Sequence, residues 1–212
     1  LSASVYGQVA LSSHSSAILA RAQPDEGRHL RLTSERTTQV RDIRLPSEAD
    51  ESYKFVREAV RAYPELYFAR FVVLGEGDSE EIVVPRLASA SALPVDPSFV
   101  SIVPLGGRHV NHFWRLLAHL QIPYVTLLDL DRERDGGGWG RIKYALTQLL
   151  EIGSPEAGVL TRETNGKKTT VTREQLSKMH DRDVSKVDLQ NAWIEHLEKH
   201  GVFFSVPLDL DF

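Results

Sequence analysis

Carboxylate residues follow two separate apolar segments of this 212-residue chain. Glu76 comes directly after the apolar run 71–75, and a second apolar run ends in Asp129 and Asp131. Carboxylate oxygens are the ligands that Mg²⁺ prefers in proteins. Three such groups brought close together repel one another unless a cation lies between them. The residue types therefore predict a divalent-metal site, with Glu80, four residues after Glu76, as a fourth candidate ligand.

The two apolar runs have the pattern of buried β-strands. Both are short, rich in Val and Leu, and bounded by glycine or an acidic residue. In open α/β sheets, ligands bind where parallel strands end. Asp129 and Asp131 alternate at a strand end, so we expect both side chains to project to the same side. We expect Glu80 to point back toward the strand end from the first turn of a helix, although an acidic residue there also simply favours the helix dipole.

Strands and helices alternate from residue 68 onward. This order predicts an α/β fold with a parallel, doubly wound sheet of about four strands, flanked by helices and connected by right-handed crossovers. The expected strands span residues 68–74, 99–105, 124–129 and 201–207. The expected helices span residues 79–92, 110–120, 142–150 and 188–200, the first of them capped by Asp78 or Ser79.

Two regions depart from this alternation of strands and helices. Residues 8–19 predict a short strand, a polar turn and the start of a helix. Two further strands are expected at 28–32 and 37–45, and a helix over 51–63 that Pro64 stops. Between residues 153 and 187 the pattern weakens, which predicts an insertion in the domain. Within it we expect a hairpin or loop at 161–172 and a short helix at 174–179.

Composition narrows the class of protein. The absence of cysteine excludes disulfides, thiolate metal sites and cysteine nucleophiles. No apolar run approaches the roughly 20 residues that span a bilayer, and no signal peptide is recognisable, so we expect a cytoplasmic protein without a membrane partner. The net charge of −4 disfavours a protein that coats nucleic acid, but it permits nucleic acid held at one site through metal ions and a local basic patch.

The acidic strand ends resemble a known domain. Residues 74–77 together with 128–131 resemble the TOPRIM signature, a strand-end Glu followed by a strand-end Asp-x-Asp. Residues 76–85, 101–107 and 131–138 resemble the OLD (overcoming lysogenization defect) nucleases, which join an ABC-type ATPase to a C-terminal TOPRIM nuclease. The resemblance covers residues 68–211.

The N-terminal residues extend this resemblance. Residues 9–15 are similar to the switch-histidine strand of an ABC-type ATPase, in which His14 would sense the nucleotide γ-phosphate. The resemblance implies the end of an ATPase domain at 1–48, a linker helix at 49–67, and a TOPRIM nuclease domain at 68–212 with its insertion at about 153–187. The chain carries no phosphate-binding Gly-x-x-x-x-Gly-Lys-Ser/Thr loop, so we expect no ATP hydrolysis by this segment alone.

The resemblance implies an endonuclease that cleaves or nicks DNA with two Mg²⁺ or Mn²⁺ ions. Glu76 and Glu80 would hold one ion, and Asp129 and Asp131 the other, with all four residues taking part in catalysis. Two such ions, about 3.5–4 Å apart, can stabilise both the attacking and the leaving oxygen. We expect Ca²⁺ to bind without supporting cleavage. The resemblance also suggests a homodimer, with the ATPase domain present in cis.

Other residues are candidates for supporting roles. Asp209 and Asp211 end the last expected strand, and we include Asp209 among the metal ligands, although a simple chain-end turn explains the pair equally well. Substrate phosphates need cations near the acids, and we expect Arg108, Arg132 and Lys143 to contact DNA. Arg134 and Arg141 are expected to be solvated surface residues.

Two alternatives remain open. The chain could be a phosphatase or phosphotransferase with Asp129 as nucleophile, because Asp-x-Asp after an apolar strand suits that chemistry. Such enzymes usually carry Thr or Ser soon afterwards, whereas Arg132, Glu133 and Arg134 follow here. The chain could also be a non-catalytic DNA-binding or assembly module, in which the acidic residues only stabilise loops.

Overall fold

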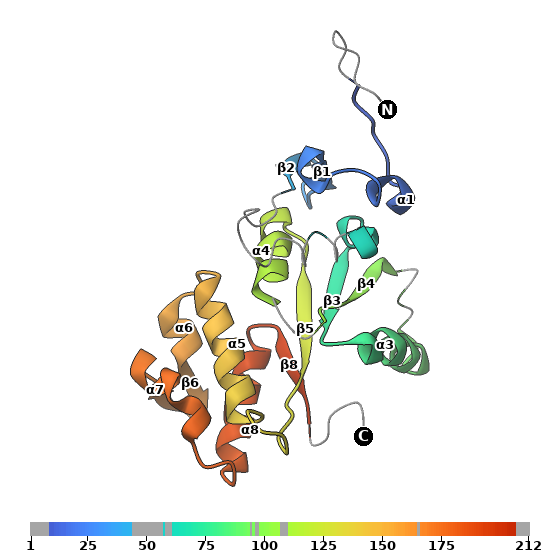
Figure 1. Ribbon diagram of the computed structural model, residues 1–212. Coiled ribbons are helices and arrows are strands. Elements are labelled where there is room, and N and C mark those ends of the chain that lie inside the picture. Colours follow the sequence, from blue (N-terminus) through green and yellow to red (C-terminus); the bar gives the residue numbers. More distant parts are fainter. Residues whose placement is uncertain are drawn as a thin grey trace.

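A four-stranded parallel sheet forms the centre of the molecule (Figure 1). The structure, a computed structural model, describes residues 9–43, 57, 61–93, 95, 98–106, 110–164 and 166–206. The strand order is β4-β3-β5-β8, and all three neighbouring pairs are parallel, as the alternating pattern predicts. The strands span β3 (Phe71–Gly75), β4 (Val100–Pro104), β5 (Tyr124–Asp129) and β8 (Val202–Ser205).

Four longer helices flank this sheet, and each lies where the sequence predicts one. They are α3 (Asp78–Ala90), α4 (Val110–Leu120), α5 (Trp139–Glu151) and α8 (Val187–Glu198). Helix α3 lies beside β4, whereas α5 and α8 lie on the side of β8 (Figure 1). The expected cap of α3 is wrong, because the cap position is Gly77 and Asp78 is already helical.

A buried hydrogen bond ties α4 to β5. Helix α4 buries one face, including Phe113 and Leu117, as its apolar spacing predicts. Within this face the Trp114 indole Nε1 donates to the Thr126 hydroxyl at 2.7 Å, and both residues are buried. The bond satisfies the polar atom of a large core side chain. It also holds the strand that ends at Asp129 against the core.

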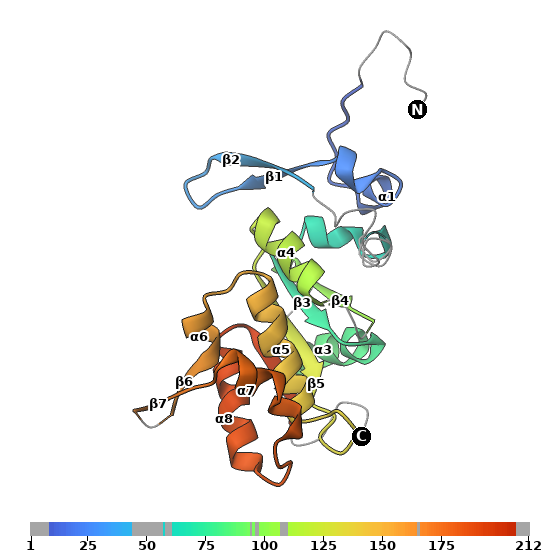
Figure 2. The same ribbon diagram turned by 60° about the vertical axis from the view of Figure 1, so that its left-hand side comes forward.

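The N-terminal segment lies at the end of the molecule where the parallel strands begin (Figures 1 and 2). It contains α1 (Ser16–Leu19), η1 (Pro24–Glu26), the antiparallel pair β1 (Arg28–Leu32) and β2 (Thr38–Asp42), and η2 (Pro64–Tyr67). The strand expected near residue 10 is wrong for residues 9–12, which are exposed and have no regular structure. Of the expected helix at 51–63, residues 57, 61 and 62 are helical, and most of the others lie outside the described residues.

The β1–β2 hairpin packs a polar face inward. His29 is buried, and its Nε2 bonds to the Tyr67 carbonyl oxygen at 2.7 Å, whereas Leu30 and Val40 are exposed. Burial is the main cause that lowers the pKa of His29. His14 is exposed in a segment without regular structure, so its assignment as a nucleotide sensor stays a prediction.

The segment between α5 and α8 forms several short elements that lie next to these two helices (Figure 2). It contains α6 (Glu156–Leu160), the hairpin β6 (Thr161–Thr164) and β7 (Lys167–Thr170), α7 (Arg173–Ser177), and η4 (Met179–Asp181). The expected hairpin and short helix are both confirmed. Across the described ranges, none of the helices has the length and apolar character that a bilayer crossing requires.

Candidate functional site

Glu76 and Asp129 meet at the carboxyl ends of two neighbouring strands. Strands β3 and β5 are parallel partners, so their ends lie at the same edge of the sheet. The backbone N–H of Asp129 donates to Glu76 Oε2 at 2.9 Å. The convergence that the strand pattern predicts is therefore confirmed for this pair.

Glu80 joins the same strand end from the first turn of α3. Its Oε2 accepts from the Gly77 N–H at 2.8 Å, which satisfies one of the free donors at the start of the helix. The side chain reaches back over Gly75, where an added Cβ would lie 2.5 Å from Glu80 Cβ. Only a glycine at this strand end leaves room for that approach.

The protonation of Glu80 reflects its neighbours. The residue is only 2% exposed. Burial is the largest cause that raises the pKa of its carboxyl group, and the charges of Asp129 and Glu76 raise it further, partly offset by backbone hydrogen bonds. Glu80, Glu76 and Asp129 are thus close enough for their charges to repel one another.

Asp131 lies just beyond the end of β5. Its φ of +48° is a left-handed conformation, so the alternation of a strand does not determine where its side chain points. The side chain is buried and pairs with Arg134 at 3.0 Å and with Arg141. Asp129 Oδ1 instead accepts from the Ser205 hydroxyl on β8 at 3.0 Å.

Arg141 connects the two strand ends. Its Nη2 donates to Glu76 Oε1 at 2.7 Å and also to Asp131 Oδ2, which accepts in addition from Nε at 2.9 Å. Burial lowers the pKa of the guanidinium, but the Asp131 and Glu76 carboxylates outweigh this and raise it above its ordinary value. The expectation that Arg141 is solvated is wrong, because helix α5 directs it into the acidic residues. Arg134, in contrast, is exposed as expected, although it pairs with Asp131.

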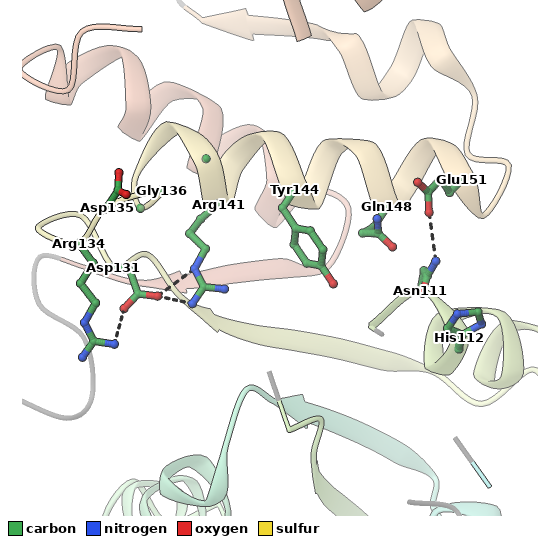
Figure 3. A pocket seen from close by; sticks show the side chains of 12 residues that line it. Asn111, His112, Asp131, Arg134, Asp135, Gly136, Arg141, Tyr144, Gln148 and Glu151 are labelled. Carbon is green, nitrogen blue, oxygen red and sulfur yellow. Dashed lines mark hydrogen bonds and ion pairs between the residues drawn. The ribbon is translucent and has the colours of Figure 1, made fainter. Parts of the chain in front are cut away.

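A cleft of about 640 Å³ extends from Asp131 along α5 (Figure 3). Arg141, Tyr144 and Gln148 line it from positions three and four residues apart, which are neighbours on one face of a helix. At the far end Asn111 Nδ2 donates to Glu151 Oε2 at 3.1 Å. Burial is the main cause that raises the pKa of Tyr144. The cleft thus opens beside the acidic strand ends and carries both polar and aromatic groups.

Two of the residues expected to contact DNA have protein partners. Arg132 Nε donates to Gln190 on α8 at 3.0 Å. Lys143 Nζ donates to the Ser177 carbonyl oxygen at 2.8 Å, because its position two residues after Arg141 turns it toward α7. These contacts describe where the side chains lie, and DNA contact by either residue stays a prediction.

Two expected site residues, Arg108 and Asp209, lie outside the described residues, as does the neighbouring Asp211. Their proposed roles in binding DNA or metal therefore stay predictions.

The four acidic residues suit a divalent ion by their chemistry, since they offer only hard oxygen donors. We call Glu76, Glu80, Asp129 and Asp131 the acid cluster. Within the part of the chain that the structure describes, no three His, Asp or Glu side chains are arranged to hold an ion as they stand. Arg141 and backbone N–H groups occupy several of the carboxylate oxygens instead.

The sequence of this region matches a described family. Residues 67–131 match the family "Overcoming lysogenization defect protein-like, TOPRIM domain". This segment is therefore similar to an OLD-like TOPRIM domain. The match begins just before β3 and ends at Asp131, so it contains all four members of the acid cluster. TOPRIM domains generally bind divalent metals, which agrees with the donor chemistry of the cluster.

Solved OLD structures are similar to the chain. The C-terminal region of the Xanthomonas campestris pv. campestris OLD protein is 24% identical with a TM-score of 0.42, over 66% of this chain and 52% of that one. The C-terminal region of the Burkholderia pseudomallei OLD protein is 24% identical with a TM-score of 0.41, over 65% and 55%. The chain thus spans about half the length of these structures. No curated protein matches it.

Proposed function

We propose that this chain is the nuclease part of an OLD-like protein, and that it cleaves or nicks DNA in a reaction that requires Mg²⁺ or Mn²⁺. One observation carries the proposal. Glu76 at the end of β3 and Asp129 at the end of β5 are joined through a 2.9 Å hydrogen bond, inside the segment that matches the OLD-like TOPRIM family. Glu80 and Asp131 add two further carboxylates beside this pair.

The acid cluster has the ligands that a pair of divalent ions needs. Glu76 and Glu80 would hold one ion, and Asp129 and Asp131 the other. When bound, two such ions activate a water and stabilise charge on the attacking and leaving oxygens of a phosphodiester. The buried position of Glu80 and Asp131 limits the water around the cluster, which strengthens charge interactions there.

The chain's own residues would orient the substrate. The cleft beside Asp131 is polar and contains Arg141, whose guanidinium suits a phosphate. The acidic face of the cluster repels a bare phosphate, so we propose that DNA binds productively only when divalent ions are present. Arg108, Arg132 and Lys143 would contact the flanking backbone.

A plasmid assay tests this function. Supercoiled plasmid is incubated with the chain and Mg²⁺, Mn²⁺, Ca²⁺ or EDTA, and nicked and linear products are quantified. We expect cleavage with Mg²⁺ and Mn²⁺ but not with Ca²⁺ or EDTA. Glu76→Gln and Asp129→Asn keep side-chain shape while removing charge, and we expect each to lower the rate at least ~100-fold, on the order of losing one group that stabilises the transition state.

Glu81→Gln is the matched control. Glu81 follows Glu80 in the first turn of α3, but it is exposed. The control removes the same charge close to the cluster and should retain the wild-type rate. Cleavage that survives both Glu76→Gln and Asp129→Asn would refute the proposed function.

A non-catalytic module is the second candidate. It is favoured because the acidic residues also stabilise the fold. The Glu76 carboxylate accepts from the backbone N–H of Asp129, and the Glu80 carboxylate accepts from the backbone N–H of Gly77. DNA binding without cleavage under any of the four conditions would support it. A phosphoenzyme trapped on Asp129 would instead support the phosphotransferase alternative.

The proposal also covers the domain boundaries and the oligomeric state of the protein. We propose that residues 1–48 end an ATPase domain that lies in cis, that residues 49–67 link it to the nuclease, and that residues 68–212 form the nuclease domain with its insertion at about 153–187. We also propose that the protein works in the cytoplasm as a homodimer. Analytical ultracentrifugation of the chain tests the dimer directly.

A further inference from the structure

We propose that Arg141 is the resident counter-ion of the acid cluster, and that divalent ions must displace its guanidinium, which then binds the substrate phosphate. This inference rests on the proposed function, because it assumes that the cluster binds metal. It goes further in assigning a role to a residue outside the matched segment 67–131.

The hydrogen bonds of the cluster show competition for the same oxygens. Glu76 Oε1 accepts from Arg141 at 2.7 Å, and Glu76 Oε2 accepts from the Asp129 N–H at 2.9 Å. Both oxygens of Asp131 also face guanidinium groups, Oδ1 that of Arg134 and Oδ2 that of Arg141. An ion at Glu76 and an ion at Asp131 would each approach an oxygen to which Arg141 donates.

The burial of these groups makes the Arg141 contacts the stronger ones. The Arg141, Glu76 and Asp131 side chains are 27%, 15% and 9% exposed. Charge-assisted hydrogen bonds are strong when they are shielded from water. Arg134 is 62% exposed, so water and salt weaken its pair with Asp131. The two arginines therefore differ in burial while sharing one carboxylate.

Displacement would leave Arg141 beside the substrate. Arg141 lies on α5 and lines the cleft together with Asp131, Tyr144 and Gln148 (Figure 3). A guanidinium can donate two parallel hydrogen bonds to one phosphate. Once ions neutralise Glu76 and Asp131, the attraction that holds Arg141 to them falls. A phosphate in the cleft would then become its best partner.

A Mn²⁺ titration tests the competition without any cleavage. Free Mn²⁺ is followed by electron paramagnetic resonance in the absence of DNA, for the wild-type chain, Arg141→Gln and Arg134→Gln. Both variants remove one positive charge next to Asp131. We expect Mn²⁺ to bind roughly tenfold more tightly to Arg141→Gln, since a lost charge-assisted bond of about 1.5 kcal/mol is worth about a factor of ten. Arg134→Gln should change the affinity less than about threefold.

Arg141→Lys provides a second variant that keeps the charge. A lysine ammonium is a point charge without the planar fork, so it cannot hold Glu76 and Asp131 in the same way. We expect intermediate Mn²⁺ affinity. Circular dichroism melts without metal establish that each variant is folded before it is titrated.

A second arm tests the phosphate contact. The affinity for a short DNA duplex is measured by fluorescence anisotropy in Ca²⁺, which is expected to bind without supporting cleavage. Arg141→Gln should bind DNA at least about fivefold more weakly although it binds Mn²⁺ more tightly, on the scale of one charge-assisted bond. Opposite changes in the two affinities are the signature of this proposal.

The possible results separate this inference from the proposed function. Equal Mn²⁺ affinity for the wild type and Arg141→Gln would overturn the inference and leave the nuclease intact. Unchanged DNA affinity in Arg141→Gln would overturn the phosphate contact. No Mn²⁺ binding by any folded variant would overturn the proposed function, and the inference with it.

Discussion

The backbone N–H of Asp129 donates to the carboxylate of Glu76, and this 2.9 Å bond joins residues 53 positions apart. It forms because β3 and β5 are parallel neighbours whose carboxyl ends share one edge of the sheet. The bond orients one oxygen of Glu76 toward the backbone and leaves the other for Arg141.

Gly75→Ala should destabilise the protein. The added Cβ would lie 2.5 Å from Glu80 Cβ and 2.9 Å from Glu80 Cγ, so α3 or the end of β3 must shift. Overpacking of this kind costs about 1–3 kcal/mol. Urea denaturation followed by circular dichroism measures the change in the free energy of unfolding.

Gly158→Ala is the control for that experiment. Gly158 is exposed in α6 and has nothing within 4 Å of the added Cβ. Alanine there should be neutral or stabilise the chain by up to about 1 kcal/mol through helix propensity. Equal stability of the two variants would show that Glu80 does not pack on Gly75.

Glu80→Gln should raise the melting temperature of the metal-free protein at pH 7. Burial, and then the charges of Asp129 and Glu76, raise the pKa of Glu80 in the folded state above its ordinary value of 4.5. The folded chain therefore holds a proton that the unfolded chain loses as the pH rises, and stability falls across this window. Glutamine imitates the protonated form and can still accept from the Gly77 N–H.

The pH dependence provides the check on Glu80. The difference between the variant and the wild type should shrink as the pH falls through the raised pKa and vanish below 4.5, where the residue is protonated in both states. Thermal melts in EDTA from pH 4 to pH 8 measure it. Glu81→Gln, at an exposed position, should not show this pattern. A lower melting temperature for Glu80→Gln at pH 7 would contradict the account.

Gly137→Ala should lower the cleavage rate about 100-fold by distorting the loop that carries Asp131. The added Cβ would lie 1.6 Å from the Asp131 carbonyl oxygen, which is too close for any side-chain atom, so the loop must shift. A displacement of about 1 Å in a catalytic group can lower the rate ~100-fold. Gly140→Ala, with nothing within 4 Å of its Cβ, should retain activity in the same plasmid assay. Similar rates for the two variants would remove Asp131 from the mechanism.

Thr126→Val should destabilise the chain because it removes the acceptor of the Trp114 indole N–H. A buried donor left without a partner costs about 1–3 kcal/mol. Thr170→Val, at an exposed position of the β6–β7 hairpin, should change the free energy of unfolding by less than about 0.5 kcal/mol. Chemical denaturation of both variants tests the comparison, and equal losses would refute it.

The strand-end acids were predictable because strands carry a local signal. The Val- and Leu-rich runs before Glu76 and Asp129 define β3 and β5, and the alternation with helices implies parallel pairing. Parallel strands end at one edge of a sheet, so Glu76 and Asp129 were expected at the same edge. That β3 and β5 are direct neighbours, although β4 lies between them in the sequence, comes from the structure. Helix α4 was predictable for the same reason, since its apolar spacing defines both ends.

The contacts that Arg141 makes with the acid cluster could not be predicted, because its partners lie elsewhere in the chain. Glu76 is 65 residues away, and the direction of the side chain depends on how the loop after Asp131 starts α5. In that loop Asp131 has a left-handed φ of +48°, and Gly137 packs against the carbonyl oxygen of Asp131. The missing strand near residue 10 has a similar cause, since a strand needs a neighbour that local sequence does not reveal.

The titration of the wild-type chain with Mn²⁺, compared with Glu76→Gln, tests the central claim most directly. If Glu76, Glu80, Asp129 and Asp131 together hold divalent ions, the wild type should bind about two Mn²⁺ ions per chain. Glu76→Gln should lose at least one of them while remaining folded. Identical binding curves for the two proteins, or no binding by either, would contradict the claim.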